Sequence, residues 1–291
     1  MHSPVTRRSP TSARAQRACV TLLRVALALA SAATDVVGAV HGPRDILDAR
    51  GRLYATAYAW SDQRQVLRVT TVDAGARRQE RTIELYERRY RDGARKVLLV
   101  FVAPDNVKGM AVLSQERGRG TPERWLYLPR QKRARRFAGQ MHDEGLLGTD
   151  LTAGELDLMR ATLDWTTATM RPTVRGPERV ADADAYGLEF GKAALGTSPA
   201  ASQYERVVLW IGSDDLVLRQ LELYGDAATP LKRILQRDVR FVGKVPVPAR
   251  IEVETPSAGT RSTFDLVEAQ FDAGFPDDVF SLPLLSSPNR N

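Results

Sequence analysis

The chain has 291 residues, of which 43% are hydrophobic, enough to bury the core of one large or two modest domains. Its formal net charge of +7 would suit a nucleic-acid-binding surface, but more than half of this excess positive charge lies at the N-terminus. Removing residues 1–39 takes away five of the 42 basic and one of the 35 acidic residues, which leaves 37 and 34 and a net charge of +3. A nearly neutral chain with a local basic patch does not indicate a nucleic-acid partner.

Residues 1–39 have the three parts of a secretory signal peptide. Four arginines precede an apolar run over 18–33, and small residues then offer cleavage after Ala32 or Ala39. The alternative is a retained membrane anchor. The run is shorter than the roughly 20 residues that a spanning helix needs, and it is interrupted by Arg24. We therefore predict a cleaved signal peptide and export to the periplasm.

The only cysteine is Cys19, inside the predicted signal peptide. The mature chain would therefore have no disulfide, no thiolate metal site and no lipidated cysteine, which suits a bacterial periplasm. No change in composition divides the rest, so we expect one domain over residues 40–285 and a frayed tail over 286–291.

After a short helix predicted over 44–50, apolar residues recur with a period of two, which is typical of half-buried strands. Glycine and proline mark the turns between them. The expected strands cover residues 66–73, 81–90, 96–102, 109–116, 123–129 and 132–138.

Residues 145–154, GLLGTDLTAG, interrupt this pattern with a glycine-rich loop that precedes a predicted helix over 152–164. Asp150 or Thr152 can cap the helix, and Glu155 stands three residues after Thr152, as in a capping box. Because the loop joins the strands to the helix, we interpret the loop as a hinge and the helix as a lid.

Alternation resumes after this helix, and an inserted loop is expected over 192–204. About a dozen strands in consecutive hairpins, with two or three helices, predict a mainly β protein. Such a sheet can close as a barrel, pack as a sandwich or curl around helices, and long strands favour a curved sheet. The further expected strands cover 166–172, 178–184, 185–191, 205–212, 216–225, 231–243, 249–255 and 261–272.

Three segments carry a resemblance to a known family: KVLLVFVAPDNVKGMAVL (96–113), WLYLPRQKRARRFAG (125–139) and GLLGTDLT (145–152). Their order and spacing resemble the outer-membrane lipoprotein-sorting (LolA-like) family of periplasmic proteins. The likeness extends over roughly 45–285. It implies an open, strongly curved antiparallel sheet, or half-barrel, with helices as a lid over a cavity for acyl chains.

The resemblance implies a periplasmic lipid- or lipoprotein-binding carrier that shelters acyl chains and transfers them between membranes. Its partners would be a lipid or acylated lipoprotein and an inner-membrane transporter or outer-membrane acceptor. The open alternative is an adaptor or sensor of the same fold that regulates an inner-membrane partner such as an exporter. Individual residues also have plainer alternatives. The basic run over 132–136 can belong to a solvated edge strand, and the apolar and aromatic residues can simply pack in the core.

The candidate residues fall into two groups. Arg133 and Arg135 share one strand face and could clamp the lid loop through Asp150. We expect contacts with an acyl chain from Leu99, Phe101, Val112, Trp125, Tyr127, Ile251 and Val253. We expect contacts with the lid or a partner from Arg133, Arg135, Arg136, Gly148 and Asp150.

No cofactor, metal site or enzymatic activity is expected. The sequence has no G-x-S-x-G, H-E-x-x-H or phosphate-binding glycine motif. His142, Asp143 and Glu144 are adjacent on one loop, and adjacent residues rarely chelate a metal alone.

Overall fold

A computed structural model describes residues 45–117, 122–137, 145–196 and 201–281, all within the unit Gly42–Asn291. The predicted signal peptide (1–39), the segment with His142 and the predicted tail (286–291) lie outside the described residues.

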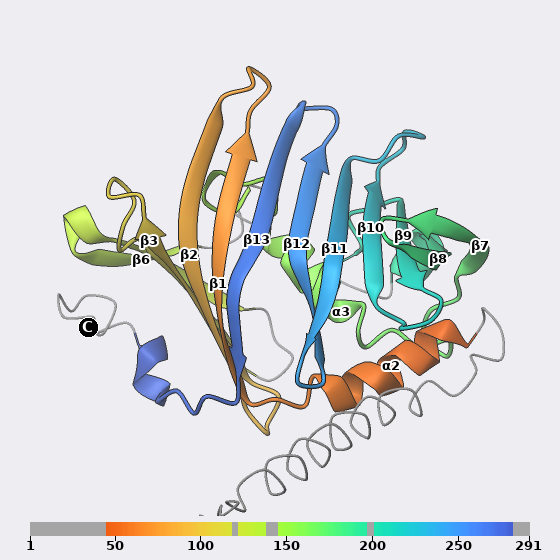
Figure 1. Cartoon of the computed structure of the whole chain (residues 1–291), viewed down its shortest axis with the longest axis horizontal. Coiled ribbons are helices and arrows are strands. Elements are labelled where there is room, and N and C mark those ends of the chain that lie inside the picture. Colours follow the sequence, from red (N-terminus) through yellow and green to blue (C-terminus); the bar gives the residue numbers. More distant parts are fainter. Residues whose placement is uncertain (1–44, 118–121, 138–144, 197–200, 282–291) are drawn as a thin grey trace, which may run out of the picture. The chain divides into compact units, whose positions relative to one another are not determined.

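The described residues form one antiparallel sheet of thirteen strands in the order β6-β5-β4-β3-β2-β1-β13-β12-β11-β10-β9-β8-β7 (Figure 1). The first half comprises β1 (Asp62–Val72), β2 (Arg78–Arg89), β3 (Arg95–Ala103), β4 (Ala111–Glu116), β5 (Glu123–Leu128) and β6 (Arg133–Phe137). The second half comprises β7 (Thr173–Val180), β8 (Ala183–Gly191), β9 (Arg206–Gly212), β10 (Leu218–Tyr224), β11 (Lys232–Val242), β12 (Val245–Thr255) and β13 (Thr260–Phe271).

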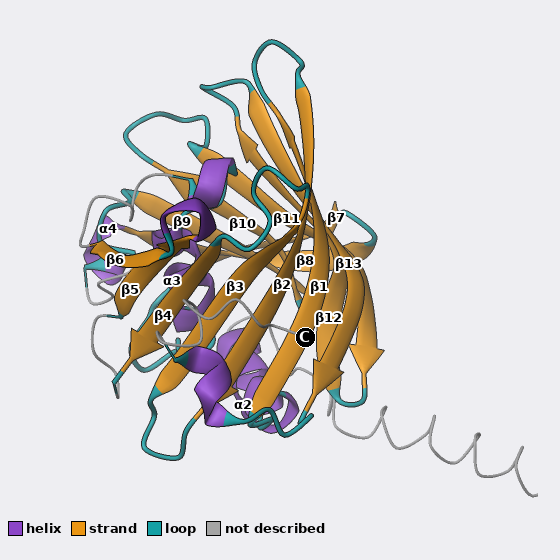
Figure 2. Cartoon of the chain, turned by 90° about the vertical axis from the view of Figure 1, so that its left-hand side faces the viewer, coloured by secondary structure: helices purple, strands orange, loops and turns teal. Residues whose placement is uncertain are grey.

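The two halves are meanders that meet where the first strand pairs with the last. Val69 of β1 stands opposite Phe264 of β13, and the sheet continues from there to β6 on one side and β7 on the other. Because β6 and β7 end the order without pairing to each other, the sheet is open. It curls, and the helices α2 (Ile46–Ala57) and α3 (Ala153–Ala161) lie inside the curve (Figure 2). The expected curved, open antiparallel sheet is confirmed.

Among the described residues, the helices are α2 (Ile46–Ala57), α3 (Ala153–Ala161) and α4 (Lys192–Leu195), with 3-10 turns η1 (Pro129–Gln131), η3 (Leu146–Gly148) and η4 (Asp277–Phe280). The predicted capping box of α3 is confirmed. The Glu155 backbone N–H donates to Thr152 Oγ1 at 3.1 Å, and the Thr152 N–H donates to the Glu155 carboxylate at 2.7 Å. Both residues are buried, so the helix begins at a defined point.

The strand predicted over 166–172 is wrong, because this segment is a turn before β7. Its threonines bond to nearby backbone instead of packing in a ladder: the Thr166 N–H donates to Thr169 Oγ1 at 3.3 Å. The Thr167 N–H donates to Asp48 of α2 at 2.9 Å. Hydroxyl side chains offer the backbone this alternative to a strand. Other expectations change in extent. The first helix continues to Ala57, the helix expected over 152–164 covers Ala153–Ala161, and the expected loop over 192–204 begins with α4. The strand expected over 178–184 contains the turn between β7 and β8.

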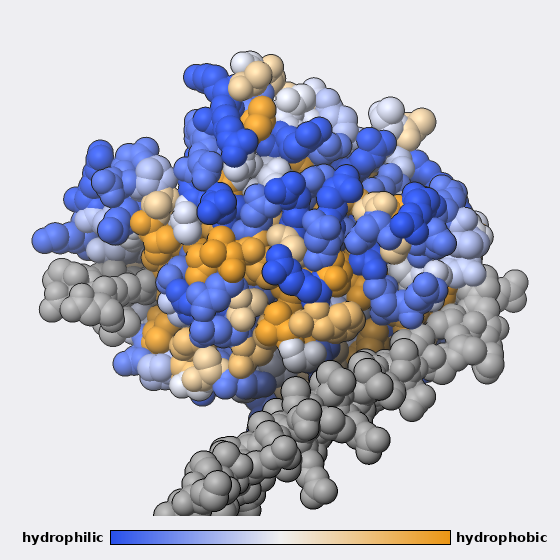
Figure 3. Space-filling view, viewed as in Figure 1, coloured by the Kyte–Doolittle hydropathy of each residue, from blue (hydrophilic) through white to orange (hydrophobic). Residues whose placement is uncertain are grey.

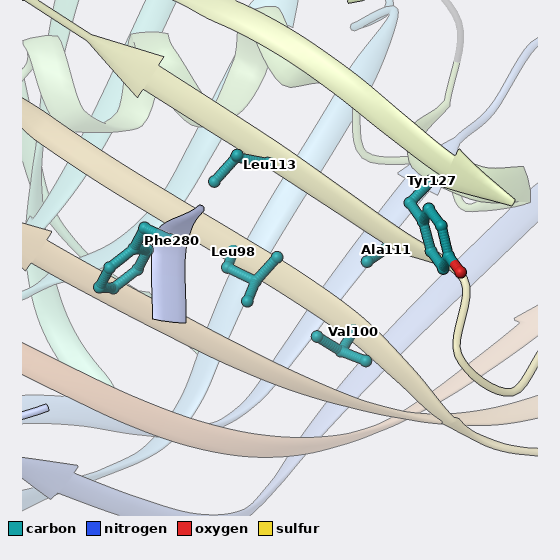
Figure 4. Close-up of a cluster of buried hydrophobic side chains, with 6 residues drawn as sticks. All are labelled: Leu98, Val100, Ala111, Leu113, Tyr127 and Phe280. Atoms are coloured by element: carbon teal, nitrogen blue, oxygen red, sulfur yellow. The ribbon is translucent and has the colours of Figure 1, made fainter. Parts of the chain in front are cut away.

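A hydrophobic cluster occupies the outer face of β3, β4 and β5 (Figure 4). Its buried members are Leu98, Val100, Ala111, Leu113, Tyr127 and Phe280. Phe280 comes from η4, so the C-terminal turn covers this part of the outer face. Lys96 and Asp277 add an ion pair at 2.7 Å.

The rest of the outer face is mixed in polarity. Figure 3 shows hydrophilic atoms gathered over the upper hairpin ends and hydrophobic atoms lower on the strands. Phe241 of β11 and Val267 of β13 are 57% and 59% exposed.

Candidate functional site

A cavity of about 310 Å³ lies on the concave face of the sheet. This volume is at the lower end of the roughly 300–1,000 Å³ of pockets that bind small molecules. Strands β1, β2, β3, β10, β11, β12 and β13 supply one wall, and α2, α3 and η3 supply the other. The apolar lining includes Leu67, Ile83, Leu85, Leu99, Phe101 and Ile251 from the sheet, and Leu146, Leu156 and Met159 from the loop and α3.

Alternation along the strands decides which side chains reach this cavity. On β3, Leu99 and Phe101 line it, whereas Leu98 and Val100 belong to the outer cluster. Leu99 stands opposite Leu85 of β2, which also lines the cavity. Successive side chains of a strand point to opposite faces, so one face of each strand serves the cavity and the other faces outward.

The structure brings together three of the seven residues expected to contact an acyl chain: Leu99, Phe101 and Ile251 line the cavity. Val112 and Val253 are buried but are not part of the lining.

Trp125 and Tyr127 lie elsewhere. They pair across the sheet with Leu113 and Ala111 and pack in the outer cluster with them. Both aromatic residues therefore contribute to core packing, which is the plainer alternative for them.

The loop before α3 is fixed to the concave face at Asp150. Its carboxylate accepts hydrogen bonds from the hydroxyls of Thr255 (2.9 Å), Thr260 and Ser262 (2.6 Å). The side chain of Lys232 donates to the Asp150 carbonyl and pairs with Glu155 at 2.8 Å. This loop therefore spans β11, β12 and β13.

Two glycines permit this loop conformation. A Cβ at Gly145 would lie 1.7 Å from the Thr149 carbonyl oxygen, which no side chain allows. Gly148 has φ +82°, a left-handed backbone conformation that favours glycine, and it is exposed beside Arg81.

Ion pairs hold α3 to the opposite part of the sheet. Asp157 pairs with Arg124 of β5 at 2.6 Å and with Arg95 of β3 at 3.7 Å. Arg160 pairs with Glu116 of β4 at 3.2 Å. The helix thus bridges the concave face from β11 to β5, and Leu156 between these contacts lines the cavity while 40% exposed.

The basic run lies on β6, the edge strand, and Arg133, Arg135 and Arg136 are all exposed. Arg136 pairs with Glu123 at 2.5 Å. Within the described residues, no ion pair joins Arg133 or Arg135 to Asp150, whose carboxylate is held by hydroxyl groups instead.

An aromatic group, Tyr54, Tyr58 and Trp60, also lines the cavity. The rings of Tyr54 and Tyr58 stack with centroids 4.6 Å apart, and Arg89 lies 3.7 Å over the Trp60 ring. Burial raises the pKa of the Tyr58 phenol well above its usual range, and its hydroxyl donates to the Pro246 carbonyl at 3.0 Å. Sequence reasoning missed this group because α2 was predicted to end before Tyr54.

The described residues contain no cluster of three or more His, Cys, Asp or Glu side chains suited to a metal ion. Among these same residues, no helix has both the length and the apolar character that crossing a membrane requires.

An open, curved antiparallel sheet with a helix-covered apolar cavity defines the class of this protein. A family model described as "-like: Uncharacterized protein" matches residues 93–287, more than half of the chain, and the chain belongs to this family. None of the curated proteins matches the sequence.

Three solved structures share the fold. A DUF1329 family protein from Desulfovibrio piger is 21% identical, with a TM-score of 0.69 over 83% of this chain and 99% of that one. A protein described as an outer membrane lipoprotein-sorting protein domain, from Vibrio parahaemolyticus, is 18% identical, with a TM-score of 0.66 over 83% and 100%. A LolA superfamily protein from Nitrosomonas europaea is 17% identical, with a TM-score of 0.57 over 82% and 97%. The LolA-like resemblance is confirmed at the level of the fold.

Proposed function

We propose that this protein is a periplasmic carrier that binds the acyl chain of a lipid or lipoprotein and transfers it between membranes. The observation that carries the proposal is accessible apolar surface inside the fold. Leu85, Leu99 and Ile251 line the cavity but are only partly buried. In a protein built only for stability, such side chains would pack against each other.

The energetics suit a carrier. Burying a methylene group is worth about 0.8 kcal/mol, so a 16-carbon chain contributes roughly 12 kcal/mol before costs. A bilayer offers a similar amount, which leaves uptake and release near balance. Contacts that hold or free α3 can then bias the direction of transfer.

The signal-peptide pattern of residues 1–39 supports export, and the fold shared with the Vibrio parahaemolyticus domain supports the carrier role. That protein is described as lipoprotein-sorting. The same role is proposed here for this chain because the cavity offers the chemistry that an acyl chain needs.

The test begins with the full chain, exported by a Gram-negative host and purified without detergent. Mass spectrometry of its organic extract should find a bound lipid or acylated peptide. Vesicle-to-vesicle transfer of a pyrene-labelled phospholipid should then be faster with the protein than without it.

Two tryptophan substitutions make this test specific. Ile251→Trp fills the cavity and should abolish transfer, whereas Val267→Trp adds the same side chain to an exposed outer position and should leave transfer unchanged. A lipid-free protein that transfers nothing, or equal transfer by both variants, would refute the carrier.

A further inference from the structure

The charged residues that line the cavity are strongly biased towards arginine. They are Arg50, Arg81, Glu87, Arg89, Arg95 and Arg160. Glu87 pairs with Arg89 at 3.0 Å and with Arg95 at 3.6 Å, and Arg160 pairs with Glu116. Within the described part of the chain, the other two arginines have no carboxylate partner.

Arg50 has a structural role. It is 2% exposed, and its Nη1 donates to the Thr162 carbonyl at 2.7 Å, which ties α2 to the end of α3. Its guanidinium also lies 4.9 Å over the Tyr54 ring. A ligand has almost no surface to touch there, so Arg50 contributes positive potential rather than a contact.

Arg81 of β2 is different because it is only partly buried and can be reached from the cavity. Its Nη2 donates to Gln79 at 2.6 Å, but its Nη1 is buried without an acceptor among the described residues. A covered cationic donor without an acceptor is unfavourable, and an anion would relieve it. Burial lowers the pKa of the Arg81 guanidinium, consistent with a charge that lacks a partner.

Apolar lining begins directly beside Arg81. Ile83 and Leu85 follow it on the same face of β2, and the paired Glu87 comes next. From residue 81 to residue 87 the strand extends about 20 Å, at 3.3 Å per residue. One leaflet contributes half of a hydrocarbon core about 30 Å thick, or about 15 Å, so a single acyl chain fits along this stretch.

We propose that the cavity selects an amphiphile with an anionic headgroup, a carboxylate or a phosphate, and that Arg81 receives this group while the chain lies along Ile83 and Leu85. This inference rests on the proposed acyl-chain binding and adds its ligand class. A guanidinium suits both anions because it donates in a planar fork. Gly148 lies against the same guanidinium, so the loop before α3 would cover the headgroup.

Competition for a neutral fluorescent probe, N-phenyl-1-naphthylamine, tests the proposal on the full mature chain. The competitors are palmitate, hexadecyl phosphate and hexadecanol, which share one chain length and differ in the headgroup. Both anions should displace the probe at concentrations at least about tenfold below that of hexadecanol, as expected for a charge-assisted hydrogen bond. The stronger of the two anions identifies the headgroup.

Variants of Arg81 separate the headgroup contact from chain binding. Arg81→Gln should remove the preference for anions and leave hexadecanol unchanged, and Arg81→Lys should keep part of the preference. Arg68→Gln is the matched control, because Arg68 lies on neighbouring β1 and is exposed. It should behave like the unmodified protein.

Two results would overturn the inference while leaving the carrier intact: equal displacement by hexadecanol and the anions, or an unchanged preference in Arg81→Gln. Failure of all three competitors, together with a lipid-free extract, would instead overturn the proposed function and this inference with it.

Discussion

Asp150 and Ser262 exchange two hydrogen bonds across more than one hundred residues of sequence. The Asp150 N–H donates to Ser262 Oγ at 2.7 Å, and the same hydroxyl donates to the Asp150 carboxylate at 2.6 Å. Ser262 is fully buried. The pair therefore fixes the loop before α3 to β13, at the place where the loop covers the concave face.

Asp150→Ala should loosen this attachment. The substitution leaves three hydroxyls without their common acceptor, and a hydrogen bond to a charged group contributes about 1.5–3 kcal/mol. We expect a loss of that size in the free energy of unfolding, measured with urea, and faster hydrogen exchange over 145–152. The exposed Asp105, changed to Ala, is the control. Unaltered exchange in Asp150→Ala would contradict the role given to this carboxylate.

Gly145→Ala tests the steric requirement of the same loop. The added Cβ would overlap the Thr149 carbonyl oxygen at 1.7 Å, so the loop must rearrange. Overpacking of this kind typically costs about 1–3 kcal/mol. The measurement is the urea midpoint, with Gly191→Ala as the matched control, because nothing lies within 4 Å of a Cβ at that position. Equal midpoints for the two variants would show that the loop adapts without cost.

Asp157→Asn should weaken the hold of the sheet on α3. The change keeps the side-chain size but removes the charge that Arg124 and Arg95 share, and both arginines are largely buried. With α3 less firmly held, bound N-phenyl-1-naphthylamine should leave the cavity several-fold faster in stopped-flow measurements. Asp164→Asn changes an exposed carboxylate just after α3 and should not alter the rate. If both variants release the probe at the wild-type rate, α3 does not govern access.

The lowered pKa of Asp277, in the C-terminal turn, predicts that the free energy of unfolding depends on pH. Hydrogen bonds from Lys96 and then Tyr90 lower the pKa of the Asp277 carboxyl below its ordinary value of 3.8. A carboxyl with a lowered folded-state pKa stabilises the fold above the unfolded pKa, and this stabilisation disappears as the pH falls through the folded value. The pair is partly exposed, so the effect should be about 0.2–1 kcal/mol.

The measurement compares wild type with Asp277→Asn in urea at pH 6 and at pH 2.5. Wild type should be the more stable at pH 6, and the gap should narrow at pH 2.5. A gap that is constant across this range would mean that the ion pair contributes nothing measurable.

Local signals predicted much of the fold. Period-two alternation located most of the strands, and the Thr152–Glu155 spacing located the start of α3. Both signals are local, because a strand exposes alternate residues and a capping box closes within one turn. The error over 166–172 has the same origin: threonines favour strands on average, but here they bond to the adjacent backbone and to α2.

The candidate site was less predictable, as the two aromatic residues of β5 show. Alternation correctly placed Trp125 and Tyr127 on one face of their strand, but it cannot say whether that face is concave or convex. Register with β4 decides this, because Tyr127 stands opposite Ala111 and packs with it in the outer cluster that also includes Phe280.

The sequence by itself therefore determined the class of fold, the order of most strands and the beginning of α3, because these depend on neighbouring residues. Only the tertiary structure decided the pairing of β1 with β13, the partners of Asp150 and the position of Arg81 at an apolar cavity. These depend on residues far apart in the chain, which the curvature and register of one open sheet bring together.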